Sequence, residues 1–306
     1  MHGTTLPTGR TARSCAALAT GSLLLTACAG SPAPANSVAD LHGRLPGSIR
    51  SAGVLRIASD PSYAPVESKA PNGAMIGLDP DIGAELGKRL GVRVEFVDTP
   101  FDKLIPGLQA QQYDAVMSAM TDDGQRRDGT DDSGRKTNPG VDFVDYFIAG
   151  TSILVAKGNP NGIKSLDDLC GTTIALQRAT TQATLAAHQS DACNRAGKPL
   201  TVQQFDTDDQ ALAALSAGQA VADLNDFPVA AYDAQNVQGG NAFQVATAQL
   251  QPGPYGIAVA KGGGALEEVL VKALDQVIRS GDYEKILAKW NLSAGAAENA
   301  VINGGF

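Results

Sequence analysis

Charged and aromatic residues that could bind a small charged molecule stand at the ends of short apolar runs. Asp60 follows the run 54–58, and Asp226 follows 221–224. Arg126 and Arg127 carry guanidinium groups, which hold carboxylates well because they donate two parallel hydrogen bonds. A buried carboxylate is the matching partner for a cation, since it can only accept hydrogen bonds.

Motifs for nucleophilic, nucleotide or metal chemistry are missing from suitable contexts in the sequence. We find no Gly-x-Ser-x-Gly turn, Walker loop or Gly-x-Gly-x-x-Gly turn placed between a strand and a helix. The three histidines, at positions 2, 42 and 188, form no metal-ligand spacing with the cysteines. We therefore expect no cofactor and no metal site.

Composition limits the classes of protein to consider. The chain has 306 residues, which predicts about two domains, and a formal net charge of -8. An acidic balance argues against a nucleic-acid binder that needs a basic face. The sequence has no apolar run long enough for a spanning helix in the mature chain.

The first 44 residues are typical of an export signal and a linker. Arg10 and Arg13 precede a short apolar stretch, as in a signal peptide over residues 1–27. Its end, Leu25-Thr26-Ala27-Cys28, resembles the bacterial lipobox, which implies lipidation of Cys28 and an anchor at the outer face of the cell membrane. An ordinary cleaved signal is the alternative. The small residues and prolines that come next predict a flexible tether over 28–44.

Strand and helix patterns then alternate along the chain. Apolar or alternating runs predict strands at 54–58, 92–97 and 113–117, with helices at 79–90 and 101–111 between them. Asp79 and Pro80 suit the start of the first helix, with Asp79 as its N-cap. A second unit repeats this order from 174 to 224. The alternation predicts an α/β fold with mostly parallel sheets flanked by helices.

Several of these segments together resemble the substrate-binding proteins of ABC importers, in the polar-amino-acid family (family 3 type). The resemblance covers about residues 45–292, and its carrying segments are 53–65, 77–82, 101–109, 113–121, 141–146 and 266–290. It implies the type II fold of periplasmic binding proteins, with two lobes joined by two hinge strands. Lobe 1 would be 45–148 with 252–306, lobe 2 would be 153–247, and the hinges would lie near 148–152 and 245–251.

The resemblance also implies a site for the ligand's carboxylate. Arg126, five residues after Thr121, matches the family's carboxylate-binding arginine, and Arg127 is the neighbouring alternative. Ser118, Ala119 and Thr121 would line the same loop.

Lobe 2 would complete the ligand site. Thr180 and Thr181 match the residues before a helix whose first amides point at the carboxylate, although Ala179 replaces the usual glycine. Asp226 matches the ammonium ligand, with helix capping as the alternative. Tyr63 and Phe101 match two aromatic residues that enclose the ligand.

Asp60 matches a position that contacts the ligand's side chain. An anion there gives a weak preference for arginine, lysine, histidine or glutamine, and turn capping before Pro61 is the alternative. One segment departs from the family pattern, because a polar insertion separates Arg126 from Val141 at residues 127–140.

Cys170 and Cys193 are expected to form a disulfide, since both would lie in lobe 2 of an exported chain, and two free thiols are the alternative. The function expected from the resemblance is capture of a small polar amino acid by a monomeric, non-enzymatic receptor that delivers it to an ABC permease. A cyclohexadienyl (arogenate or prephenate) dehydratase on the same fold, and a ligand-sensing domain, are the alternatives.

Overall fold

The computed structural model describes residues 36–306, and its main feature is one curled sheet of ten strands. The strand order along the main path is β5-β1-β6-β12-β7-β10-β8-β9. The strands on this path are β1 (Val54–Ser59), β5 (Arg93–Asp98), β6 (Ala115–Val116), β7 (Val141–Ala156), β8 (Thr173–Gln177), β9 (Thr201–Phe205), β10 (Ala222–Asp226) and β12 (Leu250–Ala260). Strands β11 (Phe243–Val245) and β13 (Ala296–Ile302) pair with β7 beside this path.

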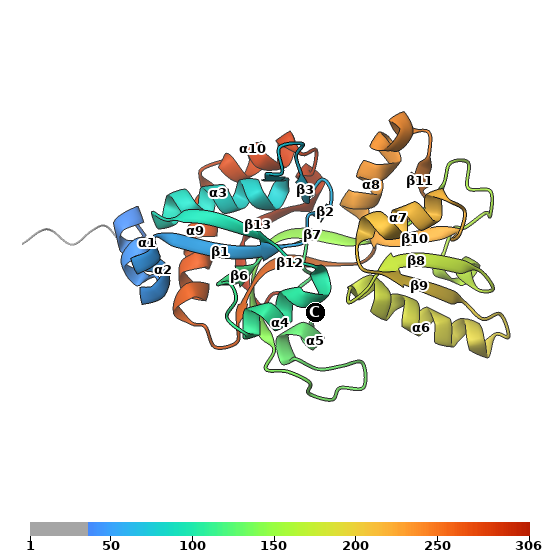
Figure 1. The fold of residues 1–306 in the computed structure, drawn as a ribbon, viewed down its shortest axis with the longest axis horizontal. Coiled ribbons are helices and arrows are strands. Elements are labelled where there is room, and N and C mark those ends of the chain that lie inside the picture. Colours follow the sequence, from blue (N-terminus) through green and yellow to red (C-terminus); the bar gives the residue numbers. More distant parts are fainter. Residues whose placement is uncertain (1–35) are drawn as a thin grey trace, which may run out of the picture. The chain divides into compact units, whose positions relative to one another are not determined.

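The sheet has a parallel part at each end and antiparallel pairing in its middle. Strand β1 runs parallel to β5 and β6 at one end, and β8 runs parallel to β9 and β10 at the other. We call the part built around β1 lobe 1 and the part built around β8 lobe 2. The long antiparallel strands β7 and β12 run from one lobe into the other, as Figure 1 shows. The predicted two-lobed α/β fold is therefore confirmed.

Helices cover both faces of the sheet in lobe 1. On one face the stripe Ile82, Leu86 and Leu90 of α3 is fully buried, because residues at i, i+4 and i+8 share one side of a helix. On the other face α4 buries Leu104 and Leu108. The helices of this lobe are α1 (Val38–Arg44), α2 (Gly47–Ala52), α3 (Leu78–Leu90), η1 (Phe101–Lys103), α4 (Leu104–Gln109), α5 (Gly124–Asp128), α9 (Ala265–Arg279), α10 (Asp282–Lys289) and η4 (Ser293–Gly295).

Lobe 2 is built in the same way around its own core. Helix α6 packs on one face of β8 and β10, while α7 and α8 pack on the other face. Its helices are η2 (Leu166–Leu169), α6 (Thr181–Arg195), α7 (Asp208–Ser216), α8 (Phe227–Asn236) and η3 (Val237–Gly240). The predicted disulfide between Cys170 and Cys193 is present and joins the end of η2 to α6.

A small antiparallel sheet, β2 (Ser62–Tyr63), β3 (Glu67–Lys69) and β4 (Met75–Ile76), comes after β1 in lobe 1. It places Tyr63 and Glu67 next to the C-terminal end of β1, where Asp60 lies. In an open α/β sheet, ligands bind outside the C-terminal ends of parallel strands. The small sheet therefore adds two side chains to the position where a ligand site is expected.

Two predictions about local structure are wrong. The tether predicted over 28–44 does not extend over Val38–Arg44, which forms helix α1 and buries Leu41 against lobe 1. The N-cap of α3 is Gly77, and Asp79 lies inside the helix with a fully buried carboxylate. The predicted signal peptide over 1–27 and the lipidation site Cys28 lie outside the described residues. None of the helices between residues 36 and 306 is long and apolar enough to cross a membrane.

Candidate functional site

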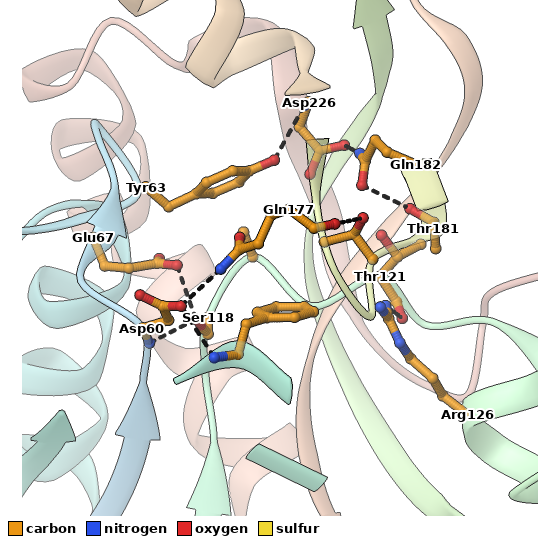
Figure 2. A pocket seen from close by; sticks show the side chains of 13 residues that line it. Asp60, Tyr63, Glu67, Ser118, Thr121, Arg126, Gln177, Thr181, Gln182 and Asp226 are labelled. Carbon is orange, nitrogen blue, oxygen red and sulfur yellow. Dashed lines mark hydrogen bonds between the residues drawn. The ribbon is translucent and has the colours of Figure 1, made fainter. Parts of the chain in front are cut away.

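All ten residues predicted to bind the ligand line one pocket between the two lobes (Figure 2). They are Asp60, Tyr63, Phe101, Ser118, Ala119, Thr121, Arg126, Thr180, Thr181 and Asp226. Glu67, Gln177 and Gln182 complete the lining and were not predicted. The free space that they enclose is about 10 Å³, which has room for about one water molecule.

Arg126 lies at one end of the pocket, on the short helix α5. Its Nη1 donates to the carbonyl of Thr121 at 2.8 Å, and its main-chain N–H is capped by Asp123 at 2.8 Å. The guanidinium carbon lies 5.6 Å from the centre of the Phe101 ring, within the range of a cation–π contact. The side chain is therefore held in place by neutral groups and by the nearby Asp123 carboxylate at 3.5 Å.

Arg127 does not line the pocket and has a different partner. Its Nη1 donates to the fully buried Asp122 at 2.8 Å, and its Nη2 donates to the carbonyl of Phe306 at 3.0 Å. This ion pair stabilises the fold, because breaking it would leave the buried Asp122 with an uncompensated charge. Of the two adjacent arginines, only Arg126 lines the pocket.

The loop from Ser118 to Thr121 connects the two ends of the pocket. Ser118 accepts a hydrogen bond from the Asp60 main-chain N–H and donates to Glu67, both at 3.0 Å. Ala119 has a positive φ of 47°, and its N–H donates to Asp79 at 3.2 Å. A non-glycine residue in this conformation costs on the order of 1 kcal/mol, so the surrounding contacts hold the loop in a strained shape.

The turn before α6 brings Thr180 and Thr181 to the pocket from lobe 2. Thr180 is the N-cap, since its hydroxyl accepts from the Ala183 N–H at 3.2 Å. Ala179 has a φ of 62°, the left-handed conformation that glycine adopts freely. The alanine thus keeps the backbone shape of the usual glycine, and its carbonyl accepts from Arg126 Nη2 at 3.2 Å.

Asp226 stands at the N-terminus of α8, but its carboxylate does not cap that helix. One oxygen accepts from Gln182 at 2.6 Å and the other from Tyr255 at 2.8 Å. Its main-chain N–H donates to the Tyr63 hydroxyl at 3.1 Å, across the cleft. Burial raises the pKa of Asp226, and the hydroxyl of Tyr255 partly offsets this. The capping alternative is therefore wrong, and the carboxylate faces the pocket.

Asp60 and Gln177 join the two lobes at the other end of the pocket. Gln177 Nε2 donates to Asp60 Oδ2 at 2.8 Å, and the same oxygen accepts from the Phe101 N–H at 3.0 Å. The second oxygen of Asp60 accepts from Ser62, so this residue also caps the turn before Pro61. Turn capping and a place in the pocket are thus both observed. Burial raises the pKa of Asp60.

Glu67 adds a second carboxylate beside Asp60. It is 1% exposed, and its Oε2 has no hydrogen-bond partner among residues 36–306. Burial, together with the charge of Asp79, raises the pKa of Glu67 well above its ordinary range. Burial likewise raises the pKa of Asp79 to about 6, although Tyr146 donates to it at 2.7 Å. The Oε2 of Glu67 needs either a proton shared with Asp79 or a cation supplied by a ligand.

Figure 2 shows how the charges divide along the pocket. Asp60 and Glu67 lie on one side, whereas Arg126, Thr181 and Asp226 lie on the other, with Tyr63 between them. The charged groups at one end are therefore a guanidinium and a carboxylate, whereas those at the opposite end are both carboxylates. Within residues 36–306, no group of three or more histidine, cysteine or acidic side chains is placed to hold a metal ion.

The insertion at 127–140 lies outside this pocket. Its residues bond mainly to one another, as in the contacts from Ser133 and Arg135 to Asp131. Asn138 also accepts from Gln109 at 2.8 Å, which ties the loop to α4. The insertion therefore comes directly after Arg126 in the chain without entering the pocket.

Comparison with known proteins gives a consistent result. Residues 55–293 match the profile of the bacterial extracellular solute-binding proteins, family 3. The arginine-binding protein ArgT of Corynebacterium glutamicum is 28% identical over 268 residues, covering 87% of this chain and 83% of that protein. The histidine-binding periplasmic protein of Escherichia coli K12 is also 28% identical, covering 77% and 86%. A solved ancestral arginine-binding protein bound to arginine has a TM-score of 0.69 at 34% identity, covering 78% and 98%.

Proposed function

Because the chain belongs to the bacterial extracellular solute-binding proteins of family 3, we propose that it captures an amino acid with a cationic side chain for an ABC importer. The curated relatives that match this chain include arginine-, histidine- and cystine-binding proteins. The observation that carries the proposed ligand class is the division of charge along the pocket, with Asp60 and Glu67 at one end and Arg126 and Asp226 at the other.

The mixed end of the pocket suits the backbone of an amino acid. Arg126 would bind the carboxylate with its guanidinium, and the hydroxyls of Thr121 and Thr181 would add neutral donors. Asp226 would bind the ammonium group, because its carboxylate is buried and faces the pocket. Tyr63 and Phe101 line the pocket between this end and the acidic end, and they would enclose the aliphatic part of the ligand.

The acidic end suits a guanidinium or ammonium group. Two buried carboxylates close together disfavour their own ionisation, and a ligand cation placed between them would relieve that cost. Gln177 could then exchange its bond to Asp60 for a bond to the ligand. A neutral ligand side chain would leave Glu67 without a charged partner, so arginine and lysine are favoured over glutamine.

We propose that the two lobes close around the bound amino acid. We propose that lobe 1 comprises 45–148 with 252–306, that lobe 2 comprises 153–247, and that both move about 148–152 and 245–251. The pocket has no room for an amino acid in its present shape, so the lobes must separate to admit one. A ligand that contacts both lobes favours the closed state by its differential affinity for it. The permease would recognise this closed form of a single receptor molecule.

Calorimetric titration of the mature protein tests the proposal. We expect one site per chain, with arginine and lysine bound at least about tenfold more tightly than glutamine, since a charge-assisted contact is worth on the order of 1.5 kcal/mol or more. The Asp60→Asn variant should lose this preference, whereas Asp98→Asn, on an exposed strand end, should keep it. Equal affinity of the wild type for arginine and glutamine would contradict the ligand class, and binding of no amino acid would contradict the function.

We also propose that Cys28 carries a lipid that anchors the mature protein outside the cell. The lipobox-like segment 25–28 supports this, because two acyl chains give stable membrane attachment. The Cys28→Ala variant should be recovered in the soluble fraction of fractionated cells. If it stays with the membranes as the wild type does, the anchor is wrong.

A further inference from the structure

Residues 303–306 run back over lobe 1 and contact the turn that carries Arg126. They come after β13, whose last residues pair with β7 at Val301↔Asp145 and Ile302↔Val144. Asn303 continues this pairing, with its N–H donating to the Phe143 carbonyl at 3.1 Å. In Figure 1 the C-terminus lies beside α5. These four residues lie beyond the part of the chain that matches the family profile. We call them the strap.

Two buried carboxylates hold the strap. The N–H of Gly304 donates to Asp145 Oδ2 at 2.8 Å, and the N–H of Gly305 donates to Asp122 Oδ2 at 2.8 Å. Asp122 is 0% exposed and Asp145 is 5% exposed. Buried carboxylates require donors, because their desolvation is costly. The strap therefore supplies hydrogen bonds that these two residues need.

The strap also binds α5 directly. The carbonyl of Phe306 accepts from the Gly124 N–H at 2.8 Å and from Arg127 Nη2 at 3.0 Å. Arg127 in turn donates to the second oxygen of Asp122 at 2.8 Å. Asp122, Arg127 and the strap thus form a closed ring of hydrogen bonds around the first turn of α5.

This ring fixes the position of Arg126 without touching the pocket. Thr121 and Asp123, the neighbours of Asp122, accept the hydrogen bonds that orient the Arg126 side chain and main chain. None of the residues 303–306 is among those that line the pocket. Phe306 does line a neighbouring cavity together with Thr121, Thr181 and Asp226. The hydrogen bonds of the strap, however, reach the site through the turn at 121–124.

We propose that the strap is a positioning element for Arg126 and that Asp122 is the residue through which it acts. This inference rests on the proposed function, in which Arg126 binds the ligand's carboxylate. By holding the turn, the strap keeps the guanidinium where the carboxylate arrives. Loss of the strap lets the turn shift and weakens the carboxylate contact, while the contacts to the ligand's side chain remain.

Gly305→Ala is the sharpest variant, because a Cβ at this position would overlap the carbonyl oxygen of Asp122. Gly43→Ala in α1 is the matched control, since an added Cβ there meets nothing within 4 Å. A chain that stops after Asn303 lacks residues 304–306 of the strap, which make the contacts to Asp145, Asp122 and α5, and it adds no clash. It serves if Gly305→Ala does not fold.

The probes are L-arginine and L-argininamide, which differ only in the carboxylate. In Gly305→Ala we expect the dissociation constant for arginine to rise about tenfold, the size of one charge-assisted contact, while that for argininamide hardly changes. Such a difference between the two probes measures coupling between the strap and the carboxylate, as in a double-mutant cycle.

Two outcomes would overturn the strap proposal alone, and a third would overturn the proposed function as well. Equal weakening of both probes would show a merely structural role for the strap, and unchanged affinity for arginine would show no role. A wild-type protein that binds neither probe would overturn the proposed function, and the strap proposal would fall with it. Gly43→Ala should match the wild type with both probes.

Discussion

Two adjacent arginines in this chain have different tasks, and the difference lies in their partners. Arg126 contacts main-chain carbonyls and lines the pocket, whereas Arg127 pairs with the fully buried Asp122. At the residue scale, therefore, one arginine is available to a ligand and the other stabilises the turn.

Substitution of each arginine by alanine should separate these roles. Arg126→Ala should weaken arginine binding by about a hundredfold or more with little change in thermal stability, because truncating one partner of a desolvated charge pair costs about 2–5 kcal/mol. Arg127→Ala should lower the free energy of unfolding by about 3 kcal/mol, because it leaves Asp122 buried and unpaired. Calorimetry and denaturant unfolding check both. Arginine affinity equal to that of the wild type in Arg126→Ala would reject the assignment.

The raised pKa of Glu67 predicts that ligand binding depends on pH. This pKa means that the free folded protein keeps a proton there above the ordinary pKa of a glutamate. A ligand cation favours the ionised form, so binding should release protons and affinity for arginine should rise with pH above the ordinary pKa of a glutamate. The sign is opposite for stability of the free protein, because the unfolded chain gives up this proton first and unfolding becomes easier as pH rises.

Calorimetry at pH 6 in buffers of different ionisation enthalpy measures this release. Glu67→Gln should release fewer protons than the wild type. Asp233→Asn is the control, because burial raises the pKa of Asp233 to about 7 but this residue lies outside the pocket. A release that is the same in wild type and Glu67→Gln would show that Glu67 does not meet the ligand's cation.

At the scale of elements, the turn between β8 and α6 carries backbone strain. Ala179 is exposed and holds a φ of 62°, a conformation that costs an alanine about 1 kcal/mol. Ala179→Gly should relieve this strain. Part of the gain is offset by the greater freedom of glycine in the unfolded chain, so we expect a net stabilisation of at most about 1 kcal/mol. Thermal unfolding of the variant measures it, and a lower melting temperature would contradict the expected relief.

The elements themselves were largely predictable, because their signals are local. The helix predicted over 79–90 is α3, whose residues Ile82, Leu86 and Leu90 are buried. Thr180 and Thr181 are expected next to a helix, which is α6, and Thr180 is its N-cap. The error at Asp79 has a physical reason. Asp-Pro is a common helix start, but Gly77 begins the helix earlier and the carboxylate is then needed inside, by Tyr146 and Ala119.

The site was predicted less completely than the elements. The ten predicted residues came from a match to a family pattern, whereas Glu67, Gln177 and Gln182 had no such match. Gln177 and Gln182 lie within a few positions of the predicted Thr180 and Thr181, so their place near the pocket could have been inferred. Glu67 begins the short strand β3, and its burial depends on the pairing of β2 with β3, which no local sequence signal predicted.

At the scale of the whole molecule, hydrogen bonds join the lobes across the pocket. Gln177 bonds Asp60, Arg126 bonds the carbonyl of Ala179, and the Asp226 N–H bonds the Tyr63 hydroxyl. Two of these bonds use Asp60 and Arg126, which are the groups proposed to bind the ligand. The closed arrangement is therefore stabilised in part by the protein's own side chains, and a ligand must replace contacts as well as add them.

Tyr63→Phe should shift the free protein toward an open arrangement. It removes the hydroxyl that accepts across the cleft, while the Asp226 N–H keeps its bond to Asn225 Oδ1 at 2.8 Å. The net cost is then about 0.5 kcal/mol, which changes the ratio of closed to open molecules by about twofold. Small-angle scattering of the free variant should give a larger radius of gyration than the wild type. Tyr113→Phe is the control, because the hydroxyl that it removes bonds carbonyls within lobe 1. Its radius of gyration should equal that of the wild type. Identical scattering from Tyr63→Phe and the wild type would contradict this role of the Tyr63 hydroxyl.

The small volume of the pocket has a consequence for the speed of capture. With room for about one water molecule, the pocket in this arrangement cannot admit an amino acid. Arrival must wait for an opening, so the observed association rate should level off at high ligand concentration at the opening rate of the free protein. Departure must wait in the same way, and the residence time of the ligand is then set by how long the lobes stay together. The lifetime of the closed state would then set the average time for which the protein keeps a bound amino acid.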